Sequence, residues 1–532
     1  MTVSSSQTAY DESPYPNLTH ELTHPDRLAT LATLLGMSPV PVENCRVLEL
    51  GCAGGANVLS MAYGLPNSHF VGIDLSEGHI EEAMKAAQFM GVTNATFQTM
   101  DIMDVKPELG QFDYIIAHGI YSWVPVPVRE QVMRICKQNL SPQGVAYVSY
   151  NTYPGWHILR MIREMMQYRT RHIEDPHERA TEAFTFMRFM ADSTSAKEYG
   201  GSYKGLFEQY IAKRPAQLTD YRGDAAILHD ELNEVNDPFY FHQFVEHAAQ
   251  HDLQYLIEAN FTSSFSDKLP SDASSFINQI ANDAVEVEQY IDFVSNRTFR
   301  RTLLCHKEVQ LTRQINPDLV GSLYVASLAK VLEVSDENEK TENPDVERFR
   351  ASDDATFATD HPLTKAAMHH LIDICPKVIS FKTLLKAACD RLGIENVDET
   401  DAMVLKAGLL QAFTYSALLA ELRIHAPQFC PEISESPVAN PLARYQSRYT
   451  GTVTNLRHEA LKLPGLGRFI LPFLDGDHTV DQILDMLVEL VEQGAIKPPK
   501  PMSSDPVEMR EELAGEVQEI LQGLAYVGVM VE

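Results

Sequence analysis

The chain has 532 residues, of which 44% are hydrophobic and 9% aromatic, and its formal net charge at pH 7 is −30. This hydrophobic content excludes a globally disordered protein. The chain is too long to fold around a single hydrophobic core, so we expect three or four domains. Such a negative charge repels phosphate backbones, and no dense block of Lys and Arg interrupts it, which argues against nucleic-acid binding.

The seven cysteines are scattered, and no two of them have the C-x-x-C spacing of a zinc site. Their odd number and their spacing predict reduced thiols in a cytoplasmic protein without a metal site. The stretch from Met1 to Glu12 is polar, so we expect no signal peptide. No apolar run reaches the roughly 18 residues of a membrane-spanning helix.

The first 155 residues predict an N-terminal arm and helix, followed by an α/β domain. The arm and helix occupy residues 1–45, with the helix at Pro25–Leu35, and from Arg46 strand-like and amphipathic stretches alternate. The expected strands are Arg46–Leu50, His69–Ile73, Ala95–Gln98, Tyr114–Ala117 and Val145–Tyr150, and the expected helices include Ile80–Met90 and Val128–Asn139. This alternation over 46–155 predicts a Rossmann-like parallel sheet with helices on both faces.

The remaining two thirds of the chain read mainly as helices. Residues 156–306 give charged and amphipathic helical stretches, and residues 307–360 include the polar run EVSDENEKTENPD, which predicts a solvated linker. Residues 361–430 and 440–532 predict two small helical or winged-helix-like modules.

The strongest local signal is VLELGCAGGAN, at Val47–Asn57. A buried strand carrying an acidic residue leads through a small-residue turn into a helix, the usual ligand crevice of α/β sheets. A dinucleotide site needs G-x-G-x-x-G, whereas this frame reads Gly51-x-Ala53-x-x-Ala56, so a pyrophosphate fits poorly. The sequence has no G-x-x-x-x-G-K-S/T motif for a nucleoside triphosphate.

Three acidic positions at successive strand ends favour a cationic nucleoside. Glu49 repels phosphate but suits the ammonium and sulfonium of S-adenosylmethionine (SAM). Asp74 can accept hydrogen bonds from both ribose hydroxyls. Asp101 can accept a hydrogen bond from the adenine amino group, while Ile102 packs on the adenine ring. Taken alone, the glycine-rich turn fits an ordinary strand-to-helix connection, and Asp74 fits a helix cap. All three features in this order, each at the end of a strand, favour a SAM site. The candidate cofactor residues are Glu49, Gly51, Cys52, Ala53, Gly54, Gly55, Asn57, Asp74, Leu75, Asp101, Ile102 and His118.

The acceptor is expected over the loops that follow the fourth and fifth strands, HGIYSWVP and YNTYPGWH. These loops hold both tryptophans, and the candidate catalytic residues are Tyr121, Trp123, His118 and Trp156. Aromatic rings suit an amine, because they attract an ammonium by cation–π contact and desolvate it. Trp156 fits a packing role at the start of a helix equally well, and His118 fits either a proton relay or a place beside the cofactor.

Other motifs have simpler explanations. Asn151-Thr152-Tyr153-Pro154 resembles the Asn-Pro-Pro-Tyr motif of nucleic-acid methylating enzymes, but it follows the wrong strand and the chain is acidic, so we reject that interpretation. His229 is expected in a core and Asp230 as a helix cap, and no further metal ligands recur at useful spacing.

The amino-acid sequences of several segments resemble those of class I methyltransferases that carry a methyltransferase regulatory domain. This group includes rickettsial protein-lysine methyltransferases. These segments are VLELGCAGGANVL, VGIDLS, FDYIIAHGIYSWVP, GVAYVSYNTYPGWH, YRGDAAILHDELNEVNDPFYFHQFVEHAAQHDLQYLIEANF and EQYIDFVSNRTFRRTLLCH. The resemblance covers most of residues 10–306 and implies a SAM cofactor, C-terminal winged-helix-like modules and, by analogy, a lysine acceptor. Ala53 departs from the general motif at the second glycine.

We therefore expect a cytoplasmic SAM-dependent methyltransferase that acts on lysine side chains of a protein. The alternatives are a small-molecule methyltransferase and a SAM-binding regulatory protein without catalysis. Charged helices after Trp156 also offer a surface through which two copies could form a homodimer.

Overall fold

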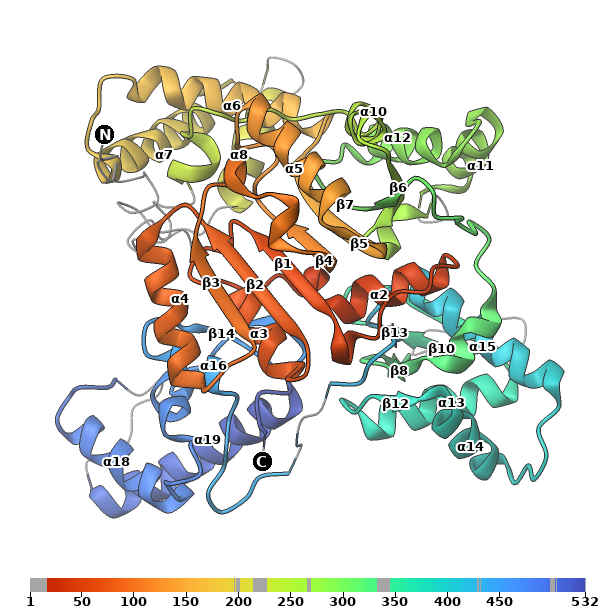
Figure 1. The fold of residues 1–532 in the computed structure, drawn as a ribbon. Coiled ribbons are helices and arrows are strands. Elements are labelled where there is room, and N and C mark those ends of the chain that lie inside the picture. The colour runs from red at the N-terminus through yellow and green to blue at the C-terminus, as the bar shows by residue number, and fades with distance from the viewer. Residues whose placement is uncertain are drawn as a thin grey trace.

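A seven-stranded sheet lies at the centre of the computed structural model (Figure 1). The structure describes residues 17–195, 197, 201–213, 227–265, 269–332, 345–427, 430, 432–497, 503 and 505–531. The sheet has the order β3-β2-β1-β4-β5-β7-β6. Strands β1 to β5 pair in parallel, and β7 runs antiparallel to both β5 and β6. The strands are β1 (Arg46–Leu50), β2 (His69–Asp74), β3 (Ala95–Thr99), β4 (Phe112–Ala117), β5 (Leu140–Asn151), β6 (Leu253–Glu258) and β7 (Phe299–His306).

The five strands expected from the sequence are present, but the sheet is larger than predicted. Strands β6 and β7 lie within residues 156–306, so the prediction of a purely helical region there is wrong. β7 escaped detection because Arg300 and Arg301 break its apolar pattern. Arg300 is nevertheless fully buried, since its guanidinium pairs with carboxylates on β6 and on the helix before β7.

Helices cover both faces of the sheet because successive strand residues point to opposite sides. Val47, Tyr114 and Tyr147 share a core with α2 and α3, whereas Leu48 and Ile115 share one with α5 and α10. The bounds are α2 (Pro25–Leu34), α3 (Ala56–Gly64), α4 (Glu77–Met90), α5 (Val126–Gln138) and α10 (Phe241–Gln250). The expected helix over Pro25–Leu35 is confirmed to within one residue.

A separate helical layer lies beside the carboxyl ends of the parallel strands. It consists of α6 (Gly155–Thr170), α7 (Pro176–Ser193), α8 (Ser202–Lys213) and the π-helical turn η6 (Ile227–Glu231), which share a small core of their own. Two further helices, α11 (Ser271–Ile280) and α12 (Ala284–Ser295), lie near β6 and β7 (Figure 1).

A middle module follows β7. Its helices are α13 (Pro362–Ile374), α14 (Phe381–Leu392) and α15 (Glu399–Tyr415), and its sheet β12-β8-β13 joins Ile379–Ser380, Tyr324–Ala326 and Glu421–Arg423. The remaining strands, β9 (Lys330–Val331), β10 (Glu347–Arg350) and β11 (Thr356–Thr359), form a second small sheet. The expected linker over 307–360 is therefore mostly structured where it is described, although residues 333–344 lie outside the described residues.

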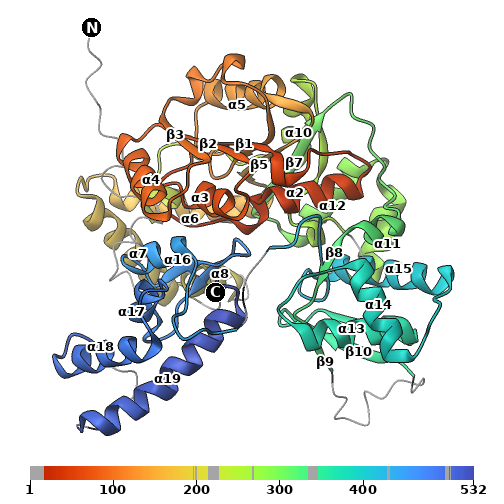
Figure 2. The same ribbon diagram turned by 60° about the horizontal axis from the view of Figure 1, so that its bottom comes forward.

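The C-terminal module has its own hydrophobic core. It contains α16 (Pro441–Ser447), β14 (Thr452–Thr454), β15 (Ala460–Lys462), α17 (Gly467–Ile470), α18 (Val480–Glu492) and α19 (Pro506–Tyr526). Figure 2 shows it beside the middle module, below the layer that holds α3 and α4. Leu442 of α16 packs among residues of α3 and α4, so this module touches the helix that follows the glycine-rich turn.

Candidate functional site

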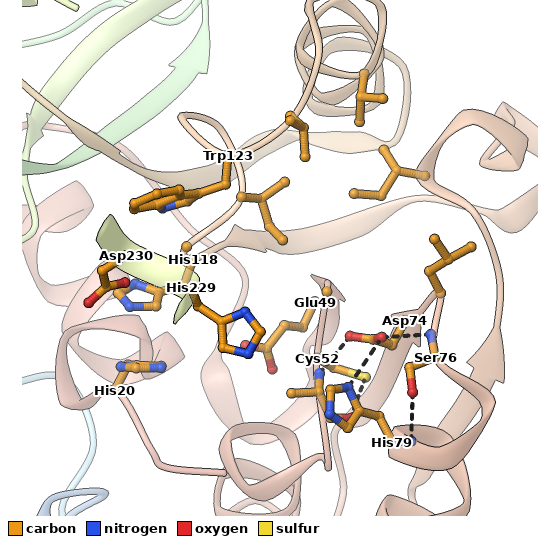
Figure 3. Close-up of a pocket in the computed structure, with 18 of the residues that line it drawn as sticks. His20, Glu49, Cys52, Asp74, Ser76, His79, His118, Trp123, His229 and Asp230 are labelled. Atoms are coloured by element: carbon orange, nitrogen blue, oxygen red, sulfur yellow. Dashed lines mark hydrogen bonds and ion pairs between the residues drawn. The ribbon is translucent and has the colours of Figure 1, made fainter. Parts of the chain in front are cut away.

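A cavity of about 580 Å³ lies at the carboxyl ends of β1, β2 and β4. The strand ends, the arm before α2, the start of α6 and η6 form its walls (Figure 3). Most of the predicted site residues line it, namely Glu49, Gly51, Cys52, Ala53, Asn57, Asp74, Leu75, Asp101, Ile102, His118, Trp123 and Trp156. The other three predicted residues, Gly54, Gly55 and Tyr121, are not part of its wall.

The turn after β1 takes its shape from left-handed backbone. Gly51, Ala53 and Gly55 have φ of 69°, 46° and 77°. Ala53, which stands where the motif usually has glycine, bears a cost of about 1–2 kcal/mol in that conformation. A Cβ on Gly55 would lie 2.7 Å from that of Ala83, so this glycine lets the turn pack against α4 rather than line the cavity.

Glu49 presents an unsatisfied buried oxygen to the cavity. Its side chain is 3% exposed; Oε1 accepts from Asn57 Nδ2 at 2.9 Å, and Oε2 has no hydrogen-bond partner in the described part of the chain. Burial raises the pKa of Glu49 to about 8, and the negative charge of Asp74 adds to this effect. A buried carboxyl group with a free oxygen suits a ligand that brings a positive charge.

Asp74 is held rigidly at the end of β2. Its Oδ2 accepts from the backbone N–H of Ala53 and its Oδ1 from that of Ser76, both at 2.9 Å. His79 Nδ1 lies 3.5 Å from Oδ1, as Figure 3 shows. These contacts fix the carboxylate where β2 meets the cavity, next to Leu75, whose side chain is 59% exposed.

Asp101 and Ile102 form the rim beyond β3. Asp101 Oδ1 accepts from the backbone N–H of Met103 at 2.9 Å, so this carboxylate caps the short helical turn that follows. Ile102 is half-buried and offers an apolar surface to the cavity. Both residues therefore lie where the sequence placed them, one strand further along the sheet than Asp74.

The rings of His118 and His20 are in contact in the cavity wall, with their planes inclined by 31°. Their ring centroids are 3.7 Å apart, and His118 Nδ1 shares a hydrogen bond of 3.0 Å with the Tyr147 hydroxyl. Burial lowers the pKa of His118 well below 6.5 and that of His20 to about 4. Both imidazoles are consequently neutral at pH 7. His20 comes from the arm before α2, and no local pattern in the sequence indicates that it reaches this site.

The two tryptophans meet at the opposite end of the cavity from Asp74. Trp123 and Trp156 have ring centroids 6.2 Å apart and planes inclined by 79°, an edge-to-face contact. Trp123 is partly exposed and Trp156 is buried, and both line the cavity. The structure thus brings together the two acceptor loops that the sequence indicated.

The turn η6 adds His229, Asp230 and Glu231 to the same end of the cavity. Figure 3 shows Asp230 and His229 on the same side of Glu49 as Trp123. His229 is buried, as expected, although it also borders the cavity. The expectation that Asp230 caps a helix is wrong, because it lies within η6 and lines the cavity. The signal available in the sequence was the run His-Asp-Glu, polar residues within the second-domain segment.

Tyr121 does not reach the cavity, which corrects its prediction as a pocket residue. It is 1% exposed, its ring packs against Phe244, and its hydroxyl hydrogen-bonds to His247 Nδ1 on α10. The loop turns between Tyr121 and Trp123, so one side chain enters the core and the other faces the cavity.

A group with possible metal ligands lies next to Tyr121. Within the described ranges, Glu130, His247 and His251 each place one ligand atom within 4.8 Å of the others. Glu130 already accepts a hydrogen bond from each histidine Nε2, both at 3.0 Å. These polar groups are therefore satisfied without an ion, and the expectation of no metal site stays a prediction.

Comparison with known proteins identifies the family. A methyltransferase domain matches residues 41–196, a predicted methyltransferase regulatory domain residues 223–306, and the PKMT C-terminal winged-helix domain residues 435–529. An uncharacterized protein of Rickettsia prowazekii is 33% identical over 518 residues, which cover 96% of this chain and 91% of that protein. The chain belongs to the PKMT family of methyltransferases. A second uncharacterized protein of the same organism is 34% identical over 250 residues, 47% of this chain and 96% of that one.

A solved structure agrees with this assignment over nearly the whole PKMT chain. PKMT2 from Rickettsia typhi superposes with a TM-score of 0.82 at 28% identity, covering 98% of this chain and 100% of that one, and it has also been solved in complex with AdoHcy. This chain is a SAM-dependent methyltransferase with SAM as methyl donor. No helix among the described residues combines the length and the apolar character that crossing a membrane requires.

The cavity of this PKMT fits a cationic nucleoside. The unpaired Oε2 of Glu49 supplies an acceptor for an ammonium, and the fixed carboxylate of Asp74 lies one strand away. Gly51 keeps the turn free of a side chain there, since a Cβ would lie 2.4 Å from Ile120 Cδ1. These observations agree with the expectation that phosphate groups are excluded and a positive charge is favoured.

Proposed function

We propose that this methyltransferase acts on lysine side chains of protein substrates. The supporting observation is the distribution of side chains along the cavity: Asp74 lies on one side of Glu49, and Trp123 and Asp230 lie on the other (Figure 3). Trp156 lies against Trp123. Indole rings and a carboxylate attract an alkylammonium. The PKMT winged-helix domain at residues 435–529 adds support from the family.

We assign the donor end as follows. Glu49 Oε2 accepts from the ammonium of SAM, Asp74 accepts from the ribose hydroxyls, and Asp101 accepts from the adenine amino group while Ile102 packs on the ring. His118 is neutral and lies between the donor and acceptor ends, so we place it beside the methionine portion. Gly54 and Gly55 contribute by shaping the turn and not by contact.

At the acceptor end the residues align an amine and strip it of water. SAM supplies an activated methyl group, so the main task of the protein is alignment. A lysine of pKa about 10.4 costs roughly 4–5 kcal/mol to deprotonate at pH 7. The indoles of Trp123 and Trp156 lower this cost by desolvating the amine, and the carboxylates of Asp230 and Glu231 are placed to hold its proton before transfer.

Three finer expectations belong to the same proposal. The first is a cytoplasmic location without nucleic-acid partners, which the scattered, unpaired cysteines and the acidic charge favour. The second is a homodimer through α6 and α7, where Tyr168 and Phe189 are 68% and 58% exposed. The third is the set of domain limits, with the sheet completed by β6 and β7.

The experiment is a labelling assay with a matched acceptor. The full chain is incubated with methyl-labelled SAM and a protein mixture, either native or with every lysine acetylated beforehand. We expect protein-bound label only when lysines are free, and N-methyllysine in the hydrolysate. Equal labelling of the acetylated mixture, or label confined to small molecules, contradicts the proposal.

A further inference from the structure

The side-chain amide of Asn57, on the first turn of α3, joins three distant parts of the chain. Its Nδ2 donates to Glu49 Oε1 at 2.9 Å and to Thr23 Oγ1 at 3.0 Å. Its Oδ1 accepts from the backbone N–H of His20 and contacts His458 Nε2, both at 2.9 Å. Asn57 is 3% exposed, so its amide depends mainly on these protein partners for hydrogen bonds.

His458 reaches this amide from the C-terminal module. It lies in the turn between β14 and β15, has φ of 66° and is 2% exposed. The turn is built by Asn455, whose Oδ1 accepts from the backbone N–H groups of Arg457 and Glu459 at 3.0 and 2.8 Å. The module's own structure therefore presents the imidazole to α3.

The contacts of His458 fix which nitrogen carries the proton. Its Nδ1 lies 2.8 Å from the Ser60 hydroxyl, which can donate, and its Nε2 faces the carbonyl oxygen of Asn57, which can only accept. Nε2 therefore carries the hydrogen and donates. Burial, together with His20 and nearby arginines, lowers the pKa of His458 to about 3, so the ring stays neutral with this single donor.

The donors around Oδ1 determine which way the amide faces. An Asn amide has two orientations that differ only in the exchange of O and N, and its partners select one. The backbone N–H of His20 requires an acceptor, so Oδ1 faces it and Nδ2 faces Glu49. The Nε2–H of His458 adds a second donor to Oδ1 and so strengthens the preference for this orientation. In the reverse orientation Oδ1 would face Glu49, and the ionised form of Glu49, which a bound ammonium favours, would meet an acceptor instead of a donor.

We propose that His458 is a positioning residue of the methyl-donor site: it holds Asn57 in the orientation in which the amide donates to Glu49. The C-terminal module thereby completes the cofactor site without touching the cofactor. This inference rests on the assignment of Glu49 to the ammonium of SAM. Because linkage is reciprocal, SAM binding in turn stabilises the docking of the module on α3.

The test compares SAM binding by full-length variants. His458→Ala removes the donor, and His458→Gln keeps an N–H that can reach Asn57. Thr454→Ala is the matched control, because Thr454 joins the same module to the arm through Thr19, at 3.2 Å, without contacting Asn57. Calorimetric titration with SAM gives the dissociation constant of each variant, and circular dichroism checks that each is folded.

We expect His458→Ala to weaken SAM binding about tenfold, His458→Gln to recover most of the loss, and Thr454→Ala to bind within twofold of the parent. The pH dependence of SAM affinity adds a second readout, which a general loss of packing would not change. Without the donor from Asn57, the Glu49 carboxyl group ionises at higher pH. The pH range over which SAM affinity rises should therefore move to higher pH. A folded His458→Ala protein that binds normally, or a Thr454→Ala protein equally impaired, overturns the inference.

Three further measurements keep the test decisive. If His458→Ala does not fold, Ser60→Ala provides the test, because it removes the hydroxyl that keeps the proton of His458 on Nε2. We expect Ser60→Ala to weaken SAM binding severalfold. Unchanged binding counts against the inference. In a cycle with Asn57→Ala, the losses from the two positions should not add, and additive losses overturn it. Glu49→Gln separates the two ideas: normal SAM binding by that variant defeats the assignment of Glu49 itself, whatever His458 does.

Discussion

The indole rings of Trp123 and Trp156 meet edge to face, 6.2 Å between centroids, although the two residues belong to loops that follow different strands. Both rings line the cavity. Because Trp156 lies in the first turn of α6, the part of the cavity wall that the two indoles form depends on the helical layer as well as on the sheet.

Replacing Trp123 with alanine tests the acceptor wall. A desolvated cation–π contact is worth about 2 kcal/mol, so kcat/KM for a protein substrate should fall roughly 30-fold, by about 1.4 kcal/mol per factor of ten. Trp123→Phe should retain most of the activity, and Tyr168→Ala, an exposed aromatic change on α6, should have no effect. The SAM dissociation constant should stay within a few-fold, and a loss confined to SAM affinity would move Trp123 to the donor end.

Glu49 should couple SAM binding to proton release. Its pKa of about 8 means that the carboxyl group is mostly protonated at pH 7, and a bound ammonium favours the ionised form. Affinity should therefore rise with pH between 6 and 7.5, by up to about tenfold per unit. Titrations in two buffers of different ionisation enthalpy measure the released proton. Glu49→Gln should bind more weakly, with no such pH dependence.

The same substitution should stabilise the protein without ligand. The folded-state pKa of Glu49 lies above its unfolded value of 4.5, so the wild type loses stability as pH rises from about 4.5 toward 8. Thermal melting at pH 8 should show a higher Tm for Glu49→Gln, and the two proteins should converge below pH 4.5. A lower Tm for the variant at pH 8 would mean that Glu49 is stabilised by contacts other than those described.

Tyr121→Phe should leave methyl transfer nearly unchanged. The hydroxyl contacts His247 in the core and does not line the cavity, so its removal costs one hydrogen bond, about 0.5–1.5 kcal/mol of folding stability. Steady-state assays should give kcat/KM within threefold of the parent, together with a small decrease in Tm. A loss of a hundredfold would restore Tyr121 to the reaction.

Arg300→Met should destabilise the fold in a pH-dependent way. Arg300 is fully buried and pairs with Glu258, Glu288 and Asp292 at 2.8–2.9 Å. Removing one partner of a buried ion pair costs about 3–5 kcal/mol. The loss should be smaller at pH 5 than at pH 8, because the uncompensated carboxylates can then take up protons. Urea unfolding at both pH values measures this, with the exposed Arg510→Met as control.

Local patterns predicted the parallel half of the sheet well. Strand-like stretches of the sequence predicted β1 to β5, and the carboxyl ends of β1 and β2 carry Glu49 and Asp74, which line the cavity. Side-chain type, strand ends and the rule for ligand crevices suffice for such residues. They do not give the direction of a side chain within a loop, so the sequence does not distinguish the buried Tyr121 from the cavity-lining Trp123.

The missed features depend on contacts between distant segments. β7 pairs with β5, which lies about 150 residues earlier in the chain. Arg300 of β7 is tolerated in the core only because it pairs with Glu258, Glu288 and Asp292. His458 lies 401 positions from Asn57. The turn that brings Asp230 and Glu231 to the cavity has no periodicity to indicate which way it faces.

The place of β7 between β5 and β6 has a consequence for biosynthesis. A ribosome must deliver residue 306 before β5 gains its second neighbour, so a nascent chain that ends near residue 155 carries a long apolar strand with one open edge. Such an edge is a template for association with other chains. Any attempt to express the catalytic part alone should therefore end after β7, where the last strand closes that edge.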